Sequence, residues 1–152
     1  MDQVVVIIEA TLRIFMRDAK DRRITPAMSN NYVKLKILPP PVKKRYNRTH
    51  LCYLVIICML KQVLAISEIR DLIQAQLENS DIAAVYDDFC TMQERSFSAM
   101  LDSAASSEET PSPNFSDRTL RVAVHASVNK MIAEKMIDIQ NPASDGRERR
   151  KE

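Results

Sequence analysis

The chain has 152 residues, one glycine, no tryptophan and a hydrophobic share of 45%. Strand-rich folds rely on glycine-containing turns, so this composition argues against a β fold and predicts an all-α protein. The net charge of +2 hides an asymmetry, because residues 1–76 hold 13 basic and 6 acidic residues while residues 77–152 hold 9 basic and 14 acidic ones.

The first predicted element covers residues 2–17. Its segment 4–8 is a run of valine and isoleucine, which by propensity alone would fit a strand. Val5, Ile8, Leu12, Phe15 and Met16 continue with the spacing of one helix face, so we predict a helix.

A second helix is predicted over residues 25–38. The Thr25 hydroxyl can cap free amides, Pro26 fits a first helical turn, and the prolines at 39–41 end the helix at Leu38. This helix would turn Met28, Tyr32 and Leu35 toward the core. Its outward residues would be Ala27, Asn30, Asn31 and Lys34.

A short basic wing is predicted over residues 39–46, with Lys43, Lys44 and Arg45 at its tip and Tyr46 at its base. Between positions 17 and 48 the chain holds 10 basic and 2 acidic residues. Such a concentration is typical of a surface that binds phosphates. A solvated basic loop is the alternative. Tyr32 and Tyr46 fit core positions as well as phosphate donors.

A buried helix is predicted next, because Asn47 can cap it and residues 51–60 are an unbroken apolar block. The block is too short for a membrane span, and no signal peptide is visible. A short helix over residues 66–77 follows, with Ile69, Leu72 and Ile73 on its packing side.

The C-terminal half is predicted to contain two apolar-striped helices. The first is capped by residues 79–81 and runs to about Ala104; the second covers about 117–139, with His125 partly buried beside its stripe. A flexible Ser- and Pro-rich connection would cover 103–116. We therefore divide the chain into a domain at 1–76, a helical extension at 77–140 that could pack on this domain or on its copy in a homodimer, and a disordered tail at 141–152.

The cysteines and the missing motifs argue against catalysis. Cys52, Cys58 and Cys90 are odd in number and lack metal-ligand spacing, so we predict buried thiols in a reducing cytoplasm. The sequence has no glycine-rich phosphate loop, nucleophile elbow or paired carboxylates. We expect no enzyme activity, no cofactor, no metal and no identifiable small-molecule site.

Together these features resemble the MerR-like winged helix-turn-helix domain. The resemblance covers about 24–74, and the features that carry it are Tyr32, residues 37–41, Arg45-Tyr46, residues 51–60, and Glu68-Ile69 with Leu72-Ile73. The chain is most similar to a family of uncharacterised bacterial proteins in which Met-x-Asn-Asn-Tyr precedes a triple proline, and in which more chain precedes the first helix. It departs from the MerR pattern by having Asn30 for an arginine, Lys36 for a glycine and Ala65 for a capping serine.

The resemblance implies a bacterial transcriptional regulator that binds double-stranded DNA, with the 25–38 helix as recognition helix and 39–46 as wing. Asn30 and Asn31 either read bases or simply face water. The alternative function is a protein-interaction module that keeps the helix-turn-helix shape without binding DNA. The predicted DNA contacts are Thr25, Ala27, Asn30, Asn31, Lys34, Lys36, Lys43, Lys44, Arg45, Tyr46 and Arg48.

Overall fold

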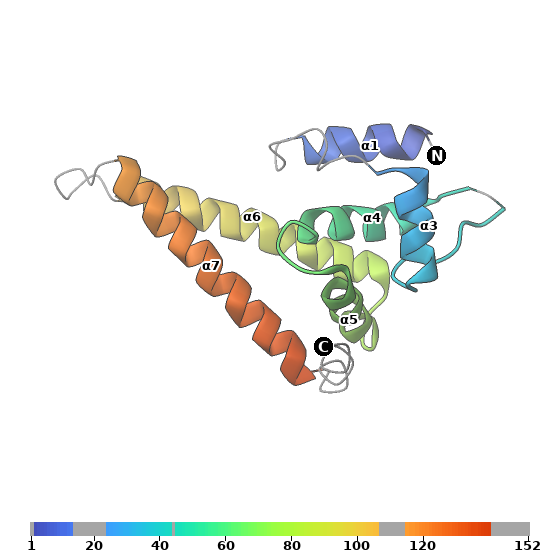
Figure 1. The fold of residues 1–152 in the computed structure, drawn as a ribbon. Helices are drawn as coiled ribbons and strands as arrows, with labels where there is room; N and C mark the ends of the chain where they lie inside the picture. The colour runs from blue at the N-terminus through green and yellow to red at the C-terminus, as the bar shows by residue number, and fades with distance from the viewer. Residues whose placement is uncertain (1, 14–23, 44, 107–114, 141–152) are drawn as a thin grey trace. The chain divides into compact units, whose positions relative to one another are not determined.

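The computed structural model describes residues 2–13, 24–43, 45–106 and 115–140, and the regular secondary structure in them is helical. Outside its helices, this part of the chain has one isolated antiparallel bridge, between Val42 and Arg45. The predicted all-α class is thereby confirmed. The helices are α1 (Asp2–Leu12), α3 (Pro26–Lys34), α4 (Arg48–Leu60), α5 (Ile66–Leu77), α6 (Ile82–Ser106) and α7 (Phe115–Gln140), as Figure 1 shows.

Helix α4 is the centre of the core. Its predicted cap is confirmed, because the Asn47 side-chain oxygen accepts a hydrogen bond from the His50 amide at 3.2 Å. The segment from Leu54 to Cys58 is buried without interruption. Burial of each large aliphatic side chain contributes about 1.5–3 kcal/mol, so this helix supplies much of the stability of its surroundings.

Helices α1 and α5 both pack against α4. In Figure 1, α1 runs alongside α4. The predicted helical spacing holds in α1, where Ile8 and Leu12 are almost fully buried, and in α5, where Ile69 and Ile73 are buried. Of the other three residues of the predicted N-terminal stripe, Val5 is half-buried, and those at 15 and 16 lie outside the described residues.

Helix α5 matches its predicted range of 66–77. Ala65 gives its start no side-chain cap, and the amide of Ala65 instead donates to Glu68 Oε2 at 2.6 Å. Arg70 and Asp71 are neighbours on this helix. They form an ion pair at 2.7 Å, and 12% of the Asp71 side chain is exposed.

The chain divides into two compact units, Met1–Asp87 and Asp88–Glu152. Helix α6 begins in the first unit, where Asp81 caps it by accepting from the Ala84 amide at 2.9 Å. It continues to Ser106, and α7 begins at Phe115, so both ends of the predicted 103–116 connection are helical. Its middle, 107–114, and the predicted tail at 141–152 lie outside the described residues.

The apolar stripes of α6 and α7 are largely exposed. His125, predicted to be partly buried, is exposed as well. None of the helices in the described ranges is long and apolar enough to cross a membrane. The exposed large apolar residues of these helices are Met92, Phe97, Met100, Leu101, Leu120, Val122, Val124, Val128, Met131, Ile132, Met136 and Ile139.

Candidate nucleic-acid interface

The start of α3 is fixed by Thr25. The Thr25 hydroxyl accepts from the Met28 amide at 3.2 Å, and its carbonyl accepts from the Ser29 amide at 3.0 Å. Pro26 occupies the first turn, where a missing amide costs nothing. Thr25 is half-buried, so its hydroxyl orients the helix rather than extending from its outer face.

One face of α3 is exposed as the sequence predicts. Helical geometry places residues three and four apart on the same side, and the side chains there are Ala27, Asn30, Asn31 and Lys34, all exposed. Ser29 and Tyr32 are buried on the opposite side. Burial, and secondarily the nearby Cys58 thiol, raises the pKa of Tyr32 to about 12. Tyr32 is therefore a core residue.

The C-terminus of α3 differs from the prediction, which placed the helix end at Leu38. The helix ends at Lys34 because Lys36 takes a left-handed conformation with φ of 58°. The amide of Lys36 donates to the Val33 carbonyl at 3.0 Å, and the amide of Ile37 donates to the Tyr32 carbonyl at 3.0 Å. These two bonds form a Schellman motif, which closes a helix before any proline is reached.

This early end changes two residues. Leu35, expected in the core, caps the helix and is 39% exposed. Ile37 and Leu38 turn inward instead and are almost fully buried. Lys36 stands where the MerR-like pattern has glycine, the residue that adopts a left-handed conformation at least cost. The glycine that the resembled pattern has at this position was therefore the sequence signal for the turn.

His50 joins the proline segment to α4, a role that the sequence did not predict. Its Nδ1 accepts from the Asn47 amide at 3.2 Å, and its Nε2 lies 3.2 Å from the Pro40 carbonyl. The Nδ1 atom also lies against the side-chain oxygen of Asn47, so Asn47 contacts the ring through both its amide and its side chain. The ring is buried and meets Tyr46 edge to face, with centroids 5.2 Å apart. His50 thereby anchors both sides of the basic loop.

The basic loop reverses direction where the wing was predicted. The Arg45 amide donates to the Val42 carbonyl at 2.9 Å, across the single bridge, and Lys43 has a positive φ of 49°. Lys43, Arg45 and Arg48 are exposed, Tyr46 is half-buried, and Lys44 lies outside the described residues. In Figure 1 the loop between α3 and α4 projects beyond both helices.

Apart from the half-buried Thr25 and Tyr46, the predicted contact residues that the structure describes are exposed, and most of them fall into two groups. One is the outer face of α3, and the other is the loop from Lys43 to Arg48. Lys36, also exposed, lies on the turn between them. The described residues contain no cluster of three or more His, Cys, Asp or Glu side chains that could hold a metal ion.

Residues 1–89 match the family described as a domain of unknown function, DUF1836, which covers more than half of the chain. The chain belongs to the DUF1836 family. The DUF1836 match ends at residue 89, close to the end of the first compact unit at Asp87. It therefore includes every predicted DNA contact and the first turns of α6. No curated protein and no solved structure matches the chain.

Proposed function

We propose that the DUF1836 domain binds double-stranded DNA as a MerR-like winged helix-turn-helix and that the protein regulates transcription in a bacterium. The observation that carries the proposal is the exposed α3 face, where two asparagines and a lysine stand beside Ala27. A helix of this width fits the major groove, asparagine can pair with the adenine edge, and lysine can contact guanine or phosphate.

The basic loop supports the same function. Lys43 and Arg45 are exposed on a projecting reversal, and Arg48 follows in the first turn of α4. Cations on such a loop neutralise phosphates and supply affinity without sequence choice. The triple proline and the His50 contact limit the freedom of the loop, so less conformational entropy is lost when it binds.

Fluorescence anisotropy with a labelled duplex tests the proposal. Binding should weaken with salt, and the slope of log K against log salt should grow by about 0.9 for each phosphate contact. Replacing Lys43, Lys44 and Arg45 with glutamate should abolish binding. The matched control replaces three exposed cations of the second unit, Arg95, Arg121 and Lys135, with glutamate and should bind normally.

Equal loss in both triple variants would mean that net charge alone drives association, and unchanged binding in both would remove the proposal. Selection of bound fragments from random duplexes then tests base reading. Asn30→Ala and Asn31→Ala should relax the selected sequence while leaving the salt slope unchanged, because amides do not neutralise phosphates.

We further propose that the protein acts as a homodimer through α6 and α7. The many exposed apolar residues of these helices support this, since large apolar side chains left in solvent often belong to interaction sites. Light scattering should give twice the 17.4 kDa chain mass. Val128→Glu with Ile132→Glu should restore the single-chain mass, while Asn129→Glu should not. The same surface also favours the second candidate function, a protein-interaction module without DNA binding.

A further inference from the structure

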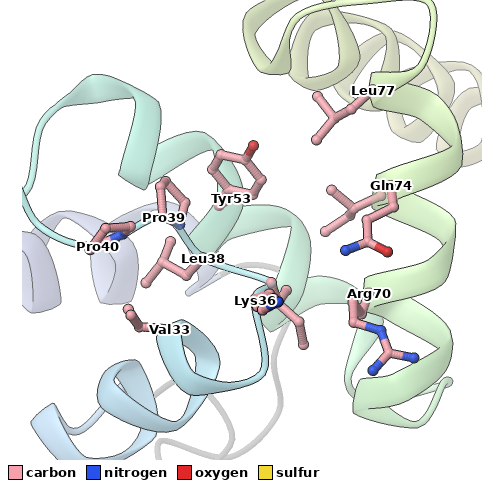
Figure 2. Close-up of a pocket in the computed structure, with 11 residues that line it drawn as sticks. Val33, Lys36, Leu38, Pro39, Pro40, Tyr53, Arg70, Gln74 and Leu77 are labelled. Atoms are coloured by element: carbon pink, nitrogen blue, oxygen red, sulfur yellow. The ribbon is translucent and has the colours of Figure 1, made fainter.

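The DUF1836 domain contains an open cavity whose lining includes one of the predicted DNA contacts, Lys36, and none of the others. Its volume is about 310 Å³, at the lower end of the range for small-molecule sites. Three elements form it: the turn and prolines after α3, one face of α5, and Tyr53 from α4 (Figure 2). All of its lining residues lie within the first unit.

The walls of the cavity are apolar and fixed. Leu38 and Pro39 form one side, and Ile73 and Leu77 form the other. The Schellman hydrogen bonds hold the turn, and proline rings fix the backbone beyond it. On α5 the cavity residues recur three and four positions apart, so a single helix face lines it. A cavity built from such elements needs little rearrangement to accept a ligand.

Four polar side chains complete the lining: Lys36, Tyr53, Arg70 and Gln74. Lys36 is carried there by the left-handed turn. The Arg70 guanidinium gives Nε and one terminal nitrogen to a single Asp71 oxygen, and its fork holds further donors. Partial burial raises the pKa of Tyr53.

We propose that this cavity binds a small organic anion, a carboxylate with an aromatic or branched apolar body. Lys36, together with the donors that Arg70 does not give to Asp71, suits such a ligand, because the carboxylate accepts charge-assisted hydrogen bonds while the body covers the apolar walls. The volume suits a small molecule, whereas a protein partner would need about 800 Å² of contact surface. This inference does not depend on DNA binding.

Phenylacetate is a suitable probe, with acetate and phenylacetamide as comparisons. Titration of the ¹⁵N-labelled full chain, followed by amide shifts, should show saturable changes at residues 36–38 and 73–77 for phenylacetate. Ligands of this size bind at about millimolar concentrations. Acetate lacks the body and phenylacetamide lacks the charge, so both should bind about tenfold more weakly.

Two pairs of variants locate the site. Gln74→Trp should fill the cavity and remove phenylacetate binding, whereas Gln76→Trp, also exposed on α5 but outside the cavity lining, should not. Lys36→Gln should weaken phenylacetate about tenfold and leave phenylacetamide unchanged, while Lys34→Gln should alter neither. The amide spectrum of each variant shows that it is folded.

The proposal is overturned if phenylacetate shifts no cavity amide at about 10 mM, a concentration above that expected for this size class. It is also overturned if phenylacetamide or acetate binds as well as phenylacetate, or if Gln74→Trp and Gln76→Trp behave alike. A large difference within each pair supports it.

Discussion

The two units of the protein use the same sequence pattern with different results. In the first unit, apolar residues at helical spacing are buried, as in α1, α4 and α5. In the second, Val128, Ile132 and Met136 follow the same spacing on α7 and are exposed. Helical periodicity therefore predicts that a helix forms and which face is apolar, but it does not say what covers that face.

The largest expected effect compares one isoleucine from each unit. Ile57 is fully buried in α4, so Ile57→Ala should lower the free energy of unfolding by about 3 kcal/mol. Ile132 is 47% exposed, and Ile132→Ala should change the same quantity by less than about 0.5 kcal/mol.

Tyrosine fluorescence during urea unfolding measures this difference. All four tyrosines, at 32, 46, 53 and 86, lie in the first unit, so the signal reports that unit. Losses of similar size for the two variants would mean that α7 is required for the stability of the α4 core.

Alkaline pH should also affect the stability of the two units differently. Burial raises the pKa of the Cys58 thiol to about 11 from an ordinary 9.0, against a smaller opposing effect of Lys61. The unfolded thiol therefore loses its proton first. Stability is full below pH 9 and falls by about 2–3 kcal/mol as the pH rises to 11.

Urea unfolding between pH 8 and 11 tests this dependence. Cys58→Ala should reduce the loss of stability with rising pH. The loss that remains is due to Tyr32, whose raised pKa acts in the same direction at higher pH. Cys90→Ala is the control and should keep the wild-type slope. An unchanged slope in Cys58→Ala would contradict the assignment.

The two histidines make a third comparison. His50 is buried and contacts Asn47 and Pro40, whereas His125 on α7 is exposed. His50→Ala should lower the free energy of unfolding by about 2 kcal/mol, because it leaves buried hydrogen-bonding groups without a partner and opens a cavity. His125→Ala should be nearly neutral. Thermal unfolding followed by circular dichroism gives both values, and equal values would show that the His50 contacts contribute little.

The smallest effect concerns a buried hydroxyl. Ser29 is fully buried, and its Oγ has no hydrogen-bond partner among the described residues. Ser29→Ala should therefore raise the free energy of unfolding by about 1 kcal/mol. Ser67→Ala, at an exposed position of α5, is the control and should have little effect. A loss of stability in Ser29→Ala would indicate that the hydroxyl has a partner after all.

Much of the fold could be predicted from local chemistry. The Asn47 cap, the apolar block at 51–60 and the range of α5 all follow from residues close together in sequence. The exposed face of α3 follows from its spacing alone. These features depend on interactions within one helix, so a single sequence contains the information.

The remaining features depend on residues distant in sequence or on backbone conformation. The His50 contact to Pro40 spans ten positions and joins a loop to a helix. The end of α3 depends on whether Lys36 adopts a left-handed conformation. The identity of a lysine side chain does not predict that conformation. The cavity needs three elements in place at once, so no local pattern indicated it.

At the two left-handed residues, Lys36 and Lys43, the requirement for stability and the requirement for positive charge favour different residues. Glycine at either position would remove a conformational penalty of about 1 kcal/mol together with the cation. Directed evolution for heat resistance alone should therefore recover glycine at both sites. Selection that also requires binding to an anionic partner should retain lysine. The ratio of glycine to lysine variants recovered would then measure how much the positive charge contributes to fitness.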